Sequence, residues 1–120
     1  MNDSKGLDYL KKKLDYLTQY EQCSLTMKEE PVDTWETLVD RKGDLIAKIN
    51  QVNFQLSYYP IESEEATFIR QAIQAKMSVI QTLDQQLMHL ASEARESLVN
   101  AMRNNNQSRH IAQYVANTQE

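Results

Sequence analysis

Glycine and proline are scarce in this chain, with two of each among 120 residues. A β-sandwich or a doubly wound α/β fold needs many tight turns, and such turns are built mainly from Gly, Pro and Asn. Leu, Gln, Ala, Lys, Glu and Met are plentiful instead, and all of them are good helix formers. We therefore predict a single domain, residues 1–120, made of a few long helices.

Two prolines and one run of asparagines divide the chain. Pro31 and Pro60 should end helices, because a proline disfavours helical geometry in the residue before it. Asn104-Asn105-Asn106 predicts a third break, since Asn is a weak helix former that favours turns. We expect an all-α protein: an antiparallel three-helix bundle with a long third helix and a short C-terminal fourth helix. The expected helices are 4–29, 33–58, 62–103 and 108–117.

Apolar residues recur along each expected helix at the three- and four-residue spacing of one buried face. Lys42 is the only polar member of the series in the second helix, and its aliphatic stem would cover apolar surface. Lys76 and Ser97 are the polar members in the third helix. The three series are Leu7, Leu10, Leu14 and Leu17; Trp35, Leu38, Lys42, Leu45, Ile49, Val52, Leu56 and Tyr59; and Ala66, Ile69, Ile73, Lys76, Ile80, Leu83, Leu87, Leu90, Ala94, Ser97 and Ala101.

The helix starts carry capping signals. Asp33 reads as an N-cap, and Glu36 three residues later completes a capping box. Ser63 reads as the N-cap of the third helix. Of the two glycines, Gly6 lies where a helix would fray in any case, and Gly43 suggests a close approach between helices.

The third helix is expected to be longer than its partners. About 40 residues at about 1.5 Å per residue reach about 60 Å, whereas the other two helices are closer to about 25 residues. Its far end must therefore overhang or be covered. The tail, residues 105–120, is the natural cover, because Ile111, Tyr114 and Val115 fall on one helical face beyond the Asn run. A homodimer formed through the uncovered end is the other arrangement that this pattern allows.

Charge and cysteine usage point to the inside of a cell. The formal charge is −4 and no face-sized basic cluster is present, since the run Lys11-Lys12-Lys13 is flanked by Asp8 and Asp15, which argues against nucleic acid as a partner. Cys23 is the only cysteine, so no internal disulfide forms, as is usual in a reducing compartment. The first residues lack the apolar run of a secretory signal, and no stretch has the roughly 20 apolar residues of a membrane span. We expect a cytoplasmic protein.

The sequence contains no strong catalytic or metal-binding motif. It has no HExxH, CxxC, calcium loop or glycine-rich phosphate loop. His89 is placed to pair with Glu93 on a helix surface. A small all-helical enzyme would need converging Arg and Glu side chains, and Arg41, Arg70 and Arg95 are scattered. We expect no catalytic residue, no metal and no cofactor, with a small helical enzyme kept as an alternative.

Three segments resemble a known family. "DTWETLVDRKGDLIAKI", "VIQTLDQQLMHLASEARESL" and "RHIAQYVAN" are similar to the second helix, the third helix and the tail of the FliT-type flagellar export chaperones. They occur in the same order, and together they cover about residues 35–117. The related FlgN-type chaperones are the nearest alternative. The first helix shares only its amphipathic character with the family.

The resemblance implies a cytoplasmic chaperone of flagellar type III protein export. It would bind the C-terminal helical segment of a late axial protein, such as the filament cap or a hook-associated protein, prevent premature assembly, and deliver it to the export gate and ATPase complex. Tyr114 matches a tail tyrosine that docks to the gate, and Ile111 and Val115 would cover the groove. A structural coiled-coil adaptor is the alternative function. The expected client-binding groove comprises Leu83, Leu87, Leu90, Ala94 and Leu98.

Overall fold

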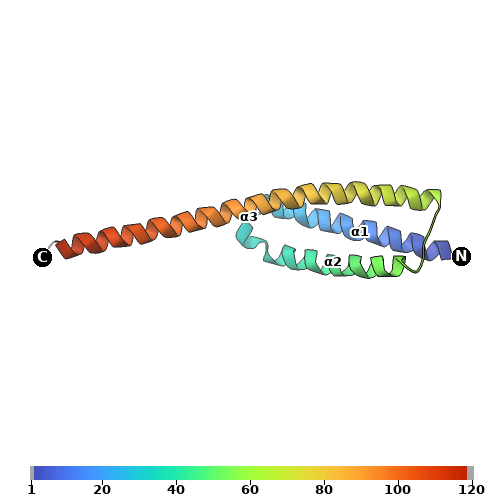
Figure 1. Ribbon diagram of the computed structural model, residues 1–120, viewed down its shortest axis with the longest axis horizontal. Helices are drawn as coiled ribbons and strands as arrows, with labels where there is room; N and C mark the ends of the chain where they lie inside the picture. Colours follow the sequence, from blue (N-terminus) through green and yellow to red (C-terminus); the bar gives the residue numbers. More distant parts are fainter. Residues whose placement is uncertain (1, 119–120) are drawn as a thin grey trace. The chain divides into compact units, whose positions relative to one another are not determined.

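The computed structural model describes the backbone of residues 2–118 and the side chains of 4–107 and 109, and helices joined by short loops make up this part of the chain. Three helices are present: α1 (Asn2–Glu29), α2 (Glu36–Leu56) and α3 (Glu64–Thr118), with a 3-10 turn, η1 (Val32–Thr34), before α2. The chain divides into two units, Met1–Leu87 and Met88–Glu120. In the first unit, α1, α2 and the first part of α3 pack together as a helical bundle (Figure 1).

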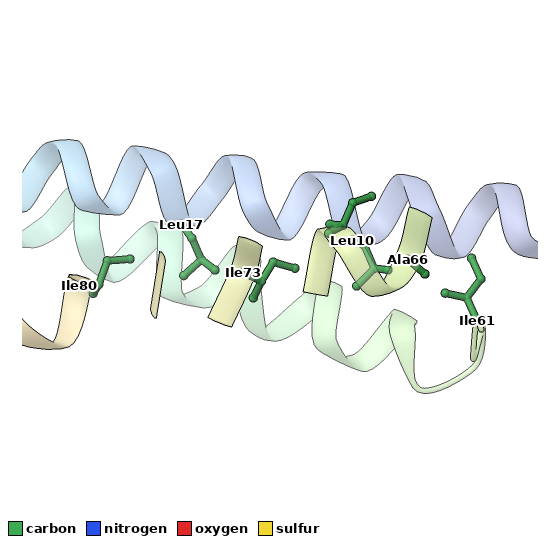
Figure 2. Close-up of a cluster of buried hydrophobic side chains, with 7 residues drawn as sticks. Leu10, Leu17, Ile61, Ala66, Ile73 and Ile80 are labelled. Carbon is green, nitrogen blue, oxygen red and sulfur yellow. The ribbon is translucent and has the colours of Figure 1, made fainter. Parts of the chain in front are cut away.

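The core of the first unit is built from the apolar series of the sequence. Its buried members come from α1, from the loop after α2 and from α3, and the inner residues of α2 pack against them (Figure 2). Burying side chains of this size removes most of their apolar surface from water, which is the main force that holds the helices together. The buried cluster consists of Leu10, Leu17, Ile61, Ala66, Ile69, Ile73 and Ile80, with Leu7, Leu14, Tyr20, Ile49 and Leu56 packed against it.

The junction between α1 and α2 is organised around Trp35. Its buried indole N–H donates a hydrogen bond to the Glu30 carbonyl oxygen at 3.1 Å, and the Thr34 hydroxyl donates to the Pro31 carbonyl oxygen at 2.7 Å. The first bond satisfies the carbonyl group of Glu30, just after α1 ends, and the second adds to the bond that the Thr34 backbone N–H donates to the same Pro31 oxygen at the start of η1. The expected capping box is wrong, because Asp33 lies inside η1 and α2 begins only at Glu36, without a side-chain cap.

The start of α3 agrees with its sequence signal. Ser63 accepts a hydrogen bond on Oγ from the Ala66 backbone N–H at 3.1 Å, so its prediction as the N-cap is confirmed. Ile61, just after Pro60, is almost fully buried, and its carbonyl oxygen accepts a hydrogen bond from Arg70 Nη2 at 2.6 Å. The loop between α2 and α3 is therefore fixed from both sides.

The two glycines have the opposite roles to those expected. A Cβ atom built on Gly6 would lie 3.0 Å from Ile61 Cδ1 and 3.0 Å from the Tyr59 carbonyl oxygen. Gly6 is therefore the position where the chain needs a missing side chain, because another segment passes close to it. A Cβ atom on Gly43 would meet nothing within 4 Å, so the expected close approach of a helix at Gly43 is wrong.

A separate fourth helix is not found. α3 runs from Glu64 to Thr118, so Asn104-Asn105-Asn106 lies inside a helix and the expected element at 108–117 belongs to α3. The physical reason is that intrinsic propensities differ by only about 0.7 kcal/mol per ordinary residue. Such a difference is too small to end a helix whose neighbouring residues, mainly Leu, Ala, Glu, Arg and Gln, favour helix on both sides of the Asn run.

Candidate functional site

The apolar series of α3 changes character at Leu87. Every apolar member from Ala66 to Leu87 is buried, whereas Leu90 and Ala94 are half-buried and Ala101 is exposed. Of the five residues predicted to form a client groove, Leu83 and Leu87 lie in the first unit and are buried there. Leu98 is 62% exposed. The predicted groove is therefore divided, with its first two members buried and its last member open to solvent.

Residues 88–102 of α3 expose four large apolar side chains. Met88 is 72% exposed and Met102 58%, and Val99 is also exposed beside Leu98. Monomeric proteins rarely expose such groups of large apolar side chains together unless the surface binds something. Methionine suits such a surface, since its flexible thioether adapts to different partners. We call the exposed residues Met88, Leu98, Val99 and Met102, with half-buried Leu90 and Ala94, the α3 apolar face.

For the three tail residues that the sequence singled out, the structure gives only their backbone positions along a helix. Ile111, Tyr114 and Val115 belong to α3, and their side chains lie outside the described residues. Their proposed roles as a groove cover and as a docking residue remain predictions.

A polar cluster joins all three helices at Asp84. Its carboxylate accepts hydrogen bonds from Tyr20 Oη at 2.9 Å and Ser24 Oγ at 3.2 Å on α1, and from Lys42 Nζ at 2.9 Å on α2. Ser24 and Lys42 are buried, so one α3 side chain satisfies three polar groups from two other helices. Buried polar groups with specific partners fix the alignment of the helices that carry them.

The surroundings of Tyr20 in this cluster change the pKa of its phenol group. Burial raises the pKa of Tyr20 to about 12, and its hydrogen bond to Asp84 and the negative charge of that carboxylate act in the same direction. The Lys42 ammonium also lies 4.5 Å from the centre of the Tyr20 ring, within the range of a cation–π contact. Elsewhere on α1, burial lowers the pKa of Lys13.

A second ion pair accounts for the other lysine of the apolar series. Lys76 Nζ on α3 lies 3.0 Å from Glu21 Oε1 on α1, and both side chains are largely buried. Sequence reasoning gave Lys42 only a role as apolar cover and gave Asp84, Glu21 and Ser24 no role. The available signal was that the second and third series each contained a single lysine among apolar residues. Such a lysine needs an anionic partner when buried.

The histidine and cysteine side chains that could take part in catalysis or metal binding, those of His89 and Cys23, have ordinary surroundings. His89 Nε2 lies 3.0 Å from Glu93 Oε1 on the exposed surface of α3, as the four-residue spacing predicted. Cys23 is a buried free thiol. Among the described residues, no three His, Cys, Asp or Glu side chains come close enough together to hold a metal ion.

Within the described residues, none of the helices combines the length and the apolar character needed to cross a membrane. No protein-family model, curated protein or solved structure matches the chain.

Proposed function

We propose that the protein is a cytoplasmic chaperone of flagellar type III export, of the FliT type or the related FlgN type, and not an enzyme. The observation that carries the proposal is the α3 apolar face, which presents large apolar side chains to solvent along one helix. The similarity of three ordered segments to that family supplies the biological context. The client is a late axial protein of the flagellum, which the chaperone keeps unassembled and passes to the export gate and ATPase complex.

Client binding follows from the spacing of the exposed residues. An amphipathic helix docks on another helix through anchors that recur every three or four residues. Leu98 and Met102 are four residues apart, so they lie on the same side of α3 and present two adjacent anchors. Leu83 and Leu87 hold the first unit together, and the client contacts begin after them, with Leu90, Ala94 and Leu98.

The finer architecture that we propose for residues 1–87 is an antiparallel bundle in which α2 runs opposite to α1 and α3. Tyr9 near the start of α1 contacts Tyr59 after α2, with 5.8 Å between ring centroids, whereas Tyr20 lies beside Lys42 near the start of α2. α1 and α3 run in the same direction, since Lys11 in the first half of α1 pairs with Glu65 at the start of α3. Such an arrangement is typical of bundles with short connections.

A pair of matched variants tests the client face. Leu98→Ser with Met102→Ser removes two exposed apolar anchors from α3, and Val39→Ser with Ile46→Ser makes the same kind of change on α2. Calorimetric titration with the C-terminal segment of the filament-cap protein should show at least roughly tenfold weaker binding for the α3 pair only, given about 1.5–3 kcal/mol per fully buried anchor. Equal effects of both pairs, or no binding by the unchanged protein to any flagellar axial protein, would contradict the proposal.

The tail is a second part of the same proposal. To compete with the client, residues 105–120 must leave the line of α3 by a bend at Asn104-Asn105-Asn106 and fold back on the α3 apolar face. Their removal should then strengthen client binding, because a competing cover lowers the apparent affinity. Tyr114→Ala should weaken docking to the export gate and leave the circular dichroism spectrum unchanged. Unchanged client affinity in a folded truncated protein would show that the tail is not a cover.

A structural coiled-coil adaptor is the second candidate. It is favoured by the long apolar series of α3, which is half-buried at Leu90 and Ala94 and exposed at Ala101, and which would suit a second long helix. An adaptor of this kind should be a stable dimer or larger assembly in sedimentation experiments without any client. A monomer that binds a flagellar axial segment with one-to-one stoichiometry would exclude the adaptor.

A further inference from the structure

The packing of α1 against α2 leaves an open hollow of about 700 Å³ on the surface of the first unit. Three aromatic rings line it: Tyr9 and Tyr16 from α1, both half-buried, and Phe54 from α2, which is 61% exposed. Lys12 and Lys48 complete its sides. The hollow therefore combines aromatic surface with two positive charges.

Both lysines are held against aromatic rings and not against carboxylates. Lys12 Nζ lies 5.7 Å from the centre of the Tyr9 ring, and Lys48 Nζ lies 5.7 Å from the centre of the Tyr16 ring. Among the described side chains, neither ammonium has a carboxylate oxygen within ion-pair distance, whereas Lys11 on the neighbouring face pairs with Glu65 at 3.3 Å. A cation–π contact orients a lysine and leaves its charge available to an anion.

The charge of the lining contrasts with the charge of the chain. The protein has a formal charge of −4, yet no acidic residue lines this hollow. Asp8 and Asp15 on α1 line an adjoining hollow, which shares Lys12 and Tyr16 with this one. The lining of the α1–α2 hollow itself thus carries two positive charges and no negative one, which favours attraction of an acidic group.

We propose that the α1–α2 hollow binds an acidic amphipathic helix of another protein. Carboxylates of the partner contact Lys12 and Lys48, and its apolar side chains pack on the aromatic rings. Tyrosine is enriched at protein interfaces because one side chain offers both a large apolar ring and a hydroxyl group. The inference does not rest on the chaperone proposal, because this surface is formed by α1 and α2 and includes no residue of the α3 apolar face.

Charge reversal at the two lysines tests the inference. The probe is a fluorescein-labelled helical peptide of about 18 residues made of Glu, Leu and Ala, with Leu at i, i+3, i+4 and i+7; a matched peptide carries Lys in place of Glu. The unchanged protein should bind the acidic peptide and not the basic one, and binding should weaken as salt is added. Lys12→Glu with Lys48→Glu should reduce affinity roughly tenfold or more.

The control variant makes the same charge change elsewhere on the same helices. Lys28→Glu with Arg41→Glu alters exposed residues of α1 and α2 that do not line the hollow, and it should bind as the unchanged protein does. Phe54→Ala should weaken binding without changing the net charge.

Equal binding of the acidic and basic peptides, or equal losses in the lysine and control variants, would overturn the inference. Lysine-dependent binding to vesicles of anionic lipid, to inorganic phosphate or to a second copy of the chain, with no binding to the acidic peptide, would also overturn it.

Discussion

The same apolar series has two different environments in this protein. From Ala66 to Leu87 its apolar members are buried in the first unit, whereas Leu90 and Ala94 are half-buried and Ala101 is exposed. The residue types and the spacing are similar in both regions. A heptad series therefore identifies a surface that can pack, and it does not identify whether the partner belongs to the same chain.

The largest difference between the two regions should appear when one apolar side chain is shortened in each. Ile73→Ala in the core should lower the free energy of unfolding by about 2–5 kcal/mol, because it leaves a cavity among buried neighbours. Leu98→Ala should change it by less than about 0.5 kcal/mol, since the side chain is already exposed. Guanidinium unfolding followed by Trp35 fluorescence measures both. Similar losses would mean that Leu98 is buried in solution.

The next largest effect should appear when a carboxylate that pairs with a cation is removed in each region. Asp84→Ala should lower the free energy of unfolding by about 2–3 kcal/mol, because it leaves the buried Lys42 ammonium unpaired. This is less than for a fully buried pair, since the Asp84 side chain is one-third exposed. Glu93→Ala is the matched change beyond Leu87. Because its pair with His89 is exposed, it should have an effect of less than about 0.5 kcal/mol. Urea unfolding distinguishes the two, and an equally small effect of Asp84→Ala would show that Lys42 reaches water easily.

The glycines sharpen the comparison within the first unit. Gly6→Ala should destabilise the protein by about 1–3 kcal/mol, because the new methyl group meets Ile61 and the Tyr59 carbonyl oxygen. Gly43→Ala should stabilise it by about 1 kcal/mol, since alanine favours helix and the site is open. Thermal unfolding by circular dichroism should therefore move in opposite directions. A stabilising Gly6→Ala would show that Ile61 moves aside readily.

The smallest effect is a pH dependence at Tyr20. Because folding raises its pKa from 10.0 to about 12, the folded state retains the phenol proton where the unfolded state loses it. The contribution of Tyr20 to stability is therefore complete below about pH 10 and is lost as the pH rises from about 10 to 12. Ultraviolet titration should show one tyrosine that ionises late, and Tyr20→Phe should remove it. A late component that persists in Tyr20→Phe would assign it to another ring.

Much of the fold was predictable because long helices leave simple marks in a sequence. The scarcity of Gly and Pro, the position of Pro31 and the Ser63 cap all agree with the structure. The start of α2 was placed wrongly because Asp33 lies inside η1, a turn held at the junction by bonds from the Trp35 indole and the Thr34 hydroxyl. Such a junction depends on contacts across a turn, which local capping patterns do not describe.

The polar cluster was harder to predict than the core. Asp84 is 42 residues from Lys42 and 64 from Tyr20 in sequence, and their meeting depends on how three helices are rotated about their axes. Helical periodicity indicates which face is apolar, but the apolar face is about a hundred degrees wide. That range is too broad to select one carboxylate among several. For the same reason, helical periodicity alone could not bring the lysine and tyrosine residues of the α1–α2 hollow together.

The single thiol has a practical consequence for studies of this protein. Cys23 is buried next to Ser24, whose side chain anchors α1 to Asp84. A water-soluble alkylating reagent can reach its Sγ only when the bundle opens, so the alkylation rate in native buffer divided by the rate in denaturant gives the fraction of time spent open. Because the chain has no other cysteine, intact-mass spectrometry would follow this one event directly. The alkylation rate of Cys23 therefore measures how often the unit Met1–Leu87 opens.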